Sequence, residues 1–238
     1  MKNLVILSGA GMSAESGIST FRDAVGLWDK YPVEQVATPE GYARNPELVI
    51  NFYNERRKQL LDVVPNAGHL GVADLERDFN VTVVTQNVDN LHERAGSTHV
   101  IHLHGELTKV CSSRDPYNPH FVKELAPEEY EVKLGDKAGD GTQLRPFIVW
   151  FGESVPEIET AIRYVEQADI FVIIGTSLNV YPAAGLLNYV PRAAEVYLID
   201  PKPVDTHVMR PIHVIQKGAS EGVKELKALL TVTQPPLP

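Results

Sequence analysis

The stretch LVILSGAGMSAESGISTFR, residues 4–22, decides the fold that this sequence predicts. Its first four residues are all apolar, which is typical of a short buried strand. Small residues follow at once and indicate a tight turn and the start of a helix. Gly9 and Gly11 let a phosphate approach the backbone, and the first N–H groups of a helix carry partial positive charge. The stretch therefore predicts a binding site for a pyrophosphate.

The spacing Gly9-x-Gly11-x-x-Ala14 fits the dinucleotide fingerprint, although the same spacing also occurs in simple tight turns. In a common dehydrogenase, a second strand would end in an acidic residue about 20 positions later and bind the adenosine ribose. Residues 17–28 show no strand pattern and contain Phe21 and Arg22. This departure argues against a dehydrogenase that transfers hydride.

Length and charge limit the class of protein. The chain has 238 residues, of which 43% are hydrophobic, and a net charge of -9. An acidic surface argues against nucleic acid and anionic membranes as partners. Cys111 is the single cysteine, so no internal disulfide forms. Because no apolar run has the length of a membrane span and the first strand begins close to Met1, we expect a cytoplasmic protein. We also expect a monomer.

Further strands are expected at residues 81–85, 99–103, 147–149, 170–174, 196–199 and 213–215. Helical patterns separate most of them, which predicts an α/β fold with a Rossmann-like, doubly wound parallel sheet. We expect one domain over residues 1–238, with the substrate cleft between a core and a smaller inserted lobe. The core is expected over residues 1–21, 65–104 and 147–230, and the lobe over residues 22–64 and 105–146.

Five motifs in order resemble those of the sirtuins, the NAD-dependent protein deacylases. They are GAGMSAESGISTFR (9–22), TQNVDNLH (85–92), HGE (104–106), VWFGE (149–153) and GTSLNV (175–180). The resemblance covers nearly the whole chain. It implies NAD as cosubstrate, acyl-lysine proteins or peptides as substrates, and transfer of the acyl group to ADP-ribose with release of nicotinamide. A non-catalytic module that binds NAD or ADP-ribose, and a sirtuin-type ADP-ribosyltransferase, are the alternatives.

The resemblance also implies which residues contact NAD. Gln86 and Asn87 would bind the nicotinamide ribose, and Asp89 the carboxamide, although Asn and Asp at this place also commonly cap a helix. Asp200 stands where the family usually has Asn, and it would disfavour the 2′-phosphate of NADP. The full expected set is Gly9, Ala10, Gly11, Ala14, Glu15, Ile18, Phe21, Arg22, Gln86, Asn87, Asp89, Gly175, Thr176, Ser177, Asp200 and Ala219.

His102 and His104 lie on one face of a predicted strand. A histidine in a strand is more often structural than catalytic. The resemblance selects His104, which precedes Gly105, as the general base that removes a proton from a ribose hydroxyl. Asn87 is the second expected catalytic residue, and His102 is expected to be structural.

Residues 44–62 predict an amphipathic helix on which Tyr53 and Arg56 share a face. On spacing alone, a packed tyrosine beside a solvated basic face is the better interpretation, and Arg57 competes with Arg56. The resemblance to sirtuins with Tyr-x-x-Arg selects Arg56 and implies that the pair binds the carboxylate of succinyl- or malonyl-lysine. The remaining residues expected to contact the substrate, partly as an added strand, are Val149, Trp150, Phe151, Gly152 and Val180.

Sirtuins usually have a structural zinc bound by two Cys-x-x-Cys pairs. This chain keeps Cys111 and lacks the other three cysteines. Asp115 and His120 could complete a metal site with Cys111, but no pattern fixes their geometry. We therefore expect no zinc and no metal-binding residues, and a small lobe stabilised by packing and hydrogen bonds.

Overall fold

The computed structural model describes residues 1–18, 31–206 and 208–232, and Phe21 and Arg22 lie outside them. The strands are β1 (Asn3–Ser8), β2 (Asn80–Thr85), β3 (Val100–His102), β4 (Gly105–Ser112), β5 (Lys123–Glu124), β6 (Leu144–Ile148), β7 (Ile170–Ile174), β8 (Glu195–Ile199) and β9 (His213–Ile215). The α-helices are α1 (Gly11–Ala14), α3 (Val33–Val36), α4 (Pro39–Arg44), α5 (Pro46–Asp62), α6 (Ala67–Asp74), α7 (Leu91–Ala95), α8 (Ile158–Val165) and α9 (Ala219–Val232). The 3-10 helices among the described residues are η1 (Leu75–Arg77), η2 (Pro119–Phe121), η3 (Pro127–Glu129) and η4 (Ala183–Tyr189).

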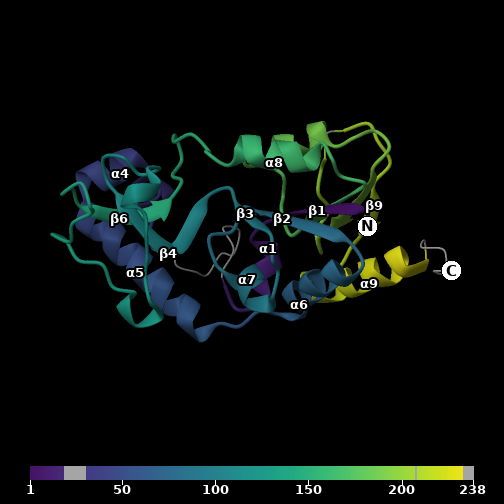
Figure 1. Cartoon of the computed structure of the whole chain (residues 1–238), viewed down its shortest axis with the longest axis horizontal. Helices are drawn as coiled ribbons and strands as arrows, with labels where there is room; N and C mark the ends of the chain where they lie inside the picture. Colours follow the sequence, from purple (N-terminus) through teal and green to yellow (C-terminus); the bar gives the residue numbers. More distant parts are fainter. Residues whose placement is uncertain (19–30, 207, 233–238) are drawn as a thin grey trace.

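Six parallel strands form the main sheet in the order β3-β2-β1-β7-β8-β9. Alternate residues of each strand point to opposite faces. Val5 and Leu7 of β1 pack with α8 and η4 on one face, whereas Leu4 and Ile6 pack with α6 and α9 on the other. Figure 1 shows α8 above the sheet, and α6 and α9 below it. The predicted Rossmann-like, doubly wound parallel sheet is therefore confirmed.

A second, antiparallel sheet has the order β5-β4-β6 and lies with α4 and α5 beside the main sheet (Figure 1). The strand expected at residues 147–149 forms as β6, at Leu144–Ile148, in this small sheet. Its expected place in the parallel sheet was wrong, because an apolar run of this length does not indicate its partner. β4 was not predicted. The residue boundaries of the core and the small lobe stay a prediction.

The helix expected over residues 44–62 forms as α5, Pro46–Asp62. Asn45 is its N-cap and accepts a hydrogen bond from the backbone N–H of Leu48 at 3.0 Å, while Pro46 occupies the first turn. Phe52 and Tyr53 of α5 pack with Trp150 in a core of their own. Among the helices of the described ranges, none is both long and apolar enough to cross a membrane.

Candidate active site

The chain changes direction in the main sheet between β1 and β7, because β2 and β3 extend to one side of β1 and β7 to β9 to the other. Open α/β sheets bind ligands at such a point, outside the carboxyl ends of the strands. A cavity of about 670 Å³ lies there. The predicted site residues that line it are Gly9, Ala10, Gly11, Ala14, Glu15, Ile18, Tyr53, Arg56, Gln86, Asn87, Asp89, His104, Val149, Trp150, Phe151, Gly152, Gly175, Thr176, Ser177, Val180 and Asp200.

Ala219 is the predicted residue that the structure places elsewhere. It is 4% exposed and packs in the core beneath the sheet, and its neighbour Gly218 lines the cavity instead. Glu15 ties this turn to the cavity, because its Oε1 accepts a hydrogen bond from the backbone N–H of Ser220 at 3.1 Å. Ala219 itself therefore does not line the cavity.

Two glycine loops meet at the cavity floor. The N–H groups of Gly9 and Gly11 donate to the carbonyls of Ile174 and Gly175 at 2.9 and 2.8 Å. A Cβ on Gly175 would lie 2.5 Å from backbone atoms of Gly11 and Met12, and Gly175 has a φ of +61°. Only glycine allows this approach without strain. The loops thus leave bare backbone facing the cavity, as a pyrophosphate requires.

Polar side chains after β2 form a connected network. Asn87 Nδ2 donates to the carbonyl of Gly9 at 3.0 Å and to Ser13 Oγ at 3.1 Å, and Ser13 Oγ donates to Asp89 Oδ2 at 2.9 Å. Burial raises the pKa of Asp89. Asp89 Oδ1 also accepts from the backbone N–H of Leu91 at 3.1 Å, whereas Asn90, the N-cap residue of α7, makes no side-chain capping hydrogen bond. Gln86 Nε2 donates to Thr176 Oγ1 at 2.9 Å and links β2 to β7.

His104 follows β3 and lines the cavity half-buried. Its Nδ1 lies 3.0 Å from the carbonyl oxygen of Gln86, and burial lowers the pKa of the imidazole. His102 does not line the cavity. Its Nε2 pairs with Glu93 at 2.7 Å and its Nδ1 with the carbonyl of Asn87 at 3.1 Å. Of the two histidines, His104 is the one that lines the cavity.

Tyr53 and Arg56 both reach the cavity from α5, and the Cζ of Arg56 lies 5.9 Å from the centre of the Tyr53 ring. Arg57 lies elsewhere. Its guanidinium donates to the carbonyl of Tyr130 at 2.7 Å and to Asn54 Oδ1 at 2.6 Å, and it is buried. Arg57 thus contacts the small lobe, whereas Arg56 is the arginine of the two that lines the cavity.

The segment after β6 forms one rim of the cavity. The backbone N–H of Val149 donates to the carbonyl of His104 at 3.0 Å, and that of Phe151 to the carbonyl of Ala37 at 2.9 Å. Phe151 is 48% exposed and Val180 is 36% exposed, so both offer apolar surface at the mouth. Trp150 is buried behind this rim.

Sequence reasoning missed several lining residues. Gln59 lies three residues after Arg56, so the helical spacing could have indicated it. Lys202 and Tyr181 also line the cavity. Tyr181 directly follows the GTSLNV motif (175–180), whereas no motif indicates Lys202. Ser13 lies inside the glycine motif and could have been predicted to contact the residues after β2.

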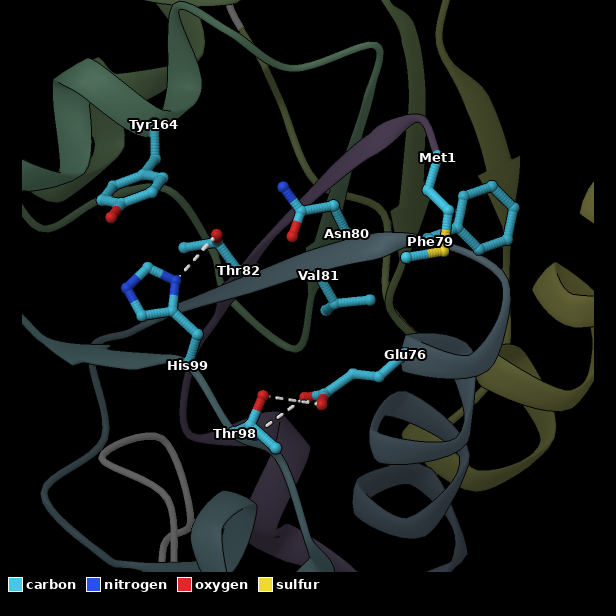
Figure 2. A pocket seen from close by; sticks show the side chains of 9 residues that line it. All are labelled: Met1, Glu76, Phe79, Asn80, Val81, Thr82, Thr98, His99 and Tyr164. Carbon is cyan, nitrogen blue, oxygen red and sulfur yellow. Dashed lines mark hydrogen bonds between the residues drawn. The ribbon is translucent and has the colours of Figure 1, made fainter.

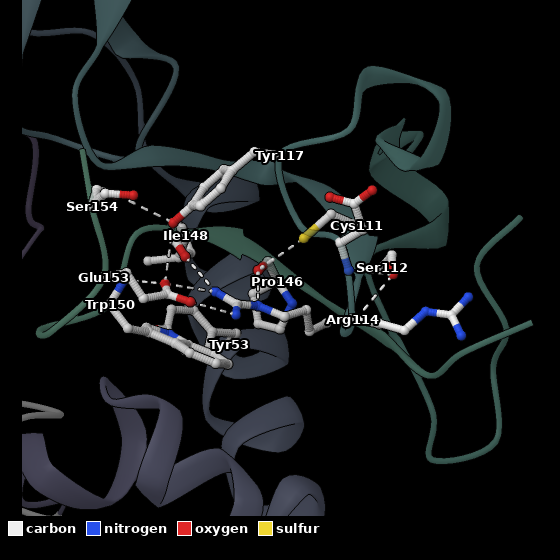
Figure 3. Close-up of polar contacts among 12 residues, drawn as sticks. Tyr53, Cys111, Ser112, Arg114, Tyr117, Pro146, Ile148, Trp150, Glu153 and Ser154 are labelled. Carbon is white, nitrogen blue, oxygen red and sulfur yellow. Dashed lines mark hydrogen bonds and ion pairs between the residues drawn. The ribbon is translucent and has the colours of Figure 1, made fainter. Parts of the chain in front are cut away.

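Cys111 is buried, and its Sγ lies 3.7 Å from the carbonyl oxygen of Pro146 (Figure 3). Burial raises the pKa of this thiol to about 12, which opposes the thiolate form that binds a metal. Within residues 1–18, 31–206 and 208–232, no three His, Cys, Asp or Glu side chains group in a way that could hold a metal ion. Asp115 and His120 therefore form no such group with Cys111.

A second hollow, of about 420 Å³, lies at the amino ends of β2 and β3, away from the ligand-binding edge (Figure 2). Its polar side chains bind one another. Thr82 Oγ1 lies 3.0 Å from His99 Nδ1, and Thr98 Oγ1 donates to Glu76 at 2.8 Å. Ligands of open α/β sheets bind at the opposite ends of the strands, so we assign no function to this hollow.

Comparison with known proteins agrees with this geometry. The sequence matches the Sir2 family over residues 9–182. An NAD-dependent protein deacylase of Bacteroides thetaiotaomicron is 84% identical over 230 residues, which cover 97% of this chain and 98% of that protein. An NAD-dependent protein deacylase of Helicobacter pylori is 51% identical over 226 residues, which cover 95% of this chain and 96% of that protein.

Solved structures are similar over the same length. A Sir2 homologue in complex with NAD has a TM-score of 0.83 and 39% identity, and the match covers 97% of this chain and 90% of that one. An ADP-ribose complex of a mutant Sir2 homologue has a TM-score of 0.84 and 37% identity, with 98% and 95% covered. The chain therefore belongs to the Sir2 family, the sirtuins. The predicted fold and the enzyme class, an NAD-dependent protein deacylase, are confirmed.

Proposed function

We propose that this deacylase acts on protein lysines whose acyl groups end in a carboxylate, succinyl and malonyl, and also on acetyl-lysine. The observation that carries the proposal is the position of Tyr53 and Arg56, which line the cavity from one face of α5. A guanidinium binds a carboxylate through two parallel charge-assisted hydrogen bonds, and a phenol adds one more donor. An acetyl group has no terminal carboxylate for this pair to bind.

The surroundings of the pair favour an anionic ligand. Burial lowers the pKa of Arg56, and burial also raises the pKa of Tyr53. At neutral pH both groups remain protonated and are hydrogen-bond donors. Because a partly desolvated guanidinium interacts with a carboxylate more strongly than an exposed one does, a succinyl or malonyl group gains more here than it would at the surface.

The other end of the cavity fits NAD. When bound, NAD supplies the ribose carbon that accepts the acyl oxygen, and nicotinamide leaves. The bare loops at Gly9, Gly11 and Gly175 suit its pyrophosphate, and Asp89 suits the amide group of nicotinamide. Asp200 follows β8 and accepts from the backbone N–H of Lys202 at 2.8 Å through Oδ1. Its carboxylate favours ribose hydroxyls over a 2′-phosphate, which supports NAD rather than NADP.

His104 is the proposed general base. With Nδ1–H donating to the carbonyl of Gln86, its Nε2 has the lone pair and takes the proton of a ribose hydroxyl. The network through Asn87 and Ser13 fixes the side chains around that ribose. The exposed rim at Phe151 and Val180 is proposed to bind the peptide backbone on either side of the acyl-lysine.

The experiment compares peptides of one sequence that bear acetyl-, malonyl-, succinyl- or succinamoyl-lysine, the last being the neutral amide of the succinyl group. Release of nicotinamide from NAD is measured with each. We expect acyl-dependent release, with succinyl well above succinamoyl. Equal rates for the charged and neutral pair would refute the carboxylate preference. Binding of NAD without release, or release that requires no acyl group, would instead favour a binding module or an ADP-ribosyltransferase.

We also propose that the small lobe contains no zinc. A hydrogen-bonded cluster occupies the segment that follows Cys111, where Asp140 accepts from Ser112 Oγ at 2.7 Å and from Thr142 Oγ1 at 2.7 Å. These bonds join β4 to the segment before β6. Elemental analysis of the purified protein tests this proposal, together with thermal unfolding in a strong chelator. Stoichiometric zinc, or a chelator-dependent fall in the unfolding temperature, would contradict it.

A cytoplasmic monomer remains our proposal for the state of the enzyme. The buried thiol of Cys111 supports the cytoplasmic location, because it suits a reducing compartment. Size-exclusion chromatography with light scattering tests the monomer, and a mass near that of a dimer would contradict it.

A further inference from the structure

Trp150 occupies the space between the pair that we propose to bind the acyl carboxylate and a buried ion pair of the small lobe. Its indole is 2% exposed, and its Nε1–H donates to the hydroxyl oxygen of Tyr53 at 3.1 Å. On its other side, the Cζ of Arg145 lies 3.5 Å from the ring centre. Figure 3 shows Trp150 and Tyr53 side by side, with Glu153 next to them.

The orientation of the indole is fixed by several contacts. Arg145 is 4% exposed and binds Glu153 with two hydrogen bonds, at 2.8 and 3.0 Å. Glu153 Oε2 also accepts from the backbone N–H of Trp150 at 2.8 Å. The guanidinium thus stacks on the ring while its partner carboxylate binds the backbone of the same residue. Trp150 therefore has little freedom to turn its N–H away from Tyr53.

This contact determines what the Tyr53 hydroxyl can do. An indole N–H is a donor only, whereas a phenol has one proton and two lone pairs. Tyr53 must accept from Trp150, so its own proton points to a different partner. A carboxylate is an acceptor only and matches that proton.

We propose that Trp150 is a positioning residue for acyl selectivity, which presents the Tyr53 hydroxyl as a hydrogen-bond donor to the acyl carboxylate, and that the Arg145–Glu153 pair holds Trp150 for this purpose. The inference rests on the proposed preference for acidic acyl groups. It assigns to the buried tryptophan a role that acts through Tyr53, in addition to its place in the cavity wall.

The test is the ratio of kcat/KM for succinyl and acetyl peptides of one sequence. Trp150→Phe keeps an aromatic ring beside Arg145 and removes the N–H. We expect the succinyl-to-acetyl ratio to fall about fivefold, the worth of one neutral hydrogen bond, mainly through a higher KM for the succinyl peptide. A purely structural role would lower both rates together and leave the ratio unchanged.

Tyr53→Phe and the double variant complete the cycle. Tyr53→Phe is expected to lower the ratio by more than Trp150→Phe does, and adding Trp150→Phe to it should change the ratio no further. If Tyr53→Phe lowers the ratio and Trp150→Phe does not, the inference is wrong and the proposed function stands. If Tyr53→Phe has no effect on the ratio, the proposed function fails for Tyr53, and the inference fails with it.

A second variant covers the case in which Trp150→Phe does not fold. Arg145→Lys keeps a charge for Glu153 and loses the planar group that stacks on the indole. We expect a smaller fall in the same ratio. An unchanged ratio in a folded Arg145→Lys protein, whose unfolding temperature is measured alongside, would overturn the part of the proposal that concerns the ion pair.

Discussion

The Nδ1 of His104 lies 3.0 Å from the backbone carbonyl oxygen of Gln86. A carbonyl oxygen only accepts hydrogen bonds, so in this pair Nδ1 has the proton and Nε2 has the lone pair. Gln86 thereby selects the tautomer of His104 that can act as a base toward the cavity. Burial at the same place lowers the pKa of the imidazole, which keeps this base neutral at neutral pH.

This relationship predicts the pH dependence of deacylation. In the proposed mechanism the neutral imidazole of His104 is the active form, so activity should be lost as pH falls through its lowered pKa. We expect the acid limb of kcat/KM to lie below pH 6.5, about the ordinary value for histidine. Measurement of nicotinamide release between pH 5 and pH 8 tests this expectation. An acid limb clearly above that value would contradict it.

Replacement of the base should remove most of the activity. His104→Ala is expected to lower kcat by about 10²- to 10⁴-fold, the usual contribution of a general base. His120→Ala is the matched control, because His120 is exposed and does not line the cavity. Comparable activity in the two variants would exclude His104 as the base.

Gly175 should be indispensable for NAD binding. Gly175→Ala would place a Cβ 2.5 Å from the backbone of Gly11 and Met12, so the phosphate-binding loops must separate. Gly135→Ala is a matched control, since Gly135 also has a positive φ, of +104°, but a Cβ there meets no atom within 4 Å. We expect Gly135→Ala to lose about 1 kcal/mol of stability from backbone strain, and Gly175→Ala to lose more because of the collision. Isothermal titration calorimetry should show that Gly175→Ala weakens NAD binding about tenfold or more. Gly135→Ala should leave the affinity for NAD unchanged. Equal affinities in the two variants would show that the collision does not matter.

Asp140 should make the small lobe sensitive to acid. Hydrogen bonds from Thr142 and Ser112 lower the pKa of Asp140 to about 2. Its ordinary value is about 3.9, so the stabilisation is fully present above that pH and is lost as pH falls toward the folded value. Asp140→Asn should therefore lower the free energy of unfolding most at neutral pH, and the difference from the parent protein should shrink below pH 4. Denaturant unfolding at several pH values tests this, and a difference independent of pH would contradict it.

Much of the fold follows from local patterns. The apolar run at residues 4–7 is a buried strand with residues in both cores, as a strand covered on both faces requires. The strands at Ile170–Ile174 and His213–Ile215 have the expected bounds. The sequence could not place β6, because Phe147 and Ile148 would suit either sheet. β4 was missed because polar residues such as Glu106 and Lys109 interrupt its apolar pattern.

The site also contains contacts that the sequence predicts and contacts that it does not. Gly9, Gln86 and Gly175 could be predicted to meet, because parallel strands end at one edge of the sheet. The bond between Trp150 and Tyr53 joins residues 97 positions apart, in a helix and in a loop. Only the packing of α5 against the small sheet brings them together, and no motif expresses that packing. Arg56 and Arg57 likewise differ in burial, and helical spacing alone does not predict which of the two is buried.

The most direct test of the acidic-acyl preference is the selectivity of Arg56→Met. Lys58→Met is its control, because Lys58 is an exposed cation two residues further along α5. Both proteins are assayed with succinyl and acetyl peptides of one sequence. We predict that Arg56→Met lowers the succinyl-to-acetyl ratio of kcat/KM about tenfold or more, as expected for hydrogen bonds to a charged group, and that Lys58→Met leaves it unchanged. The same ratio in Arg56→Met and the parent protein would contradict the account.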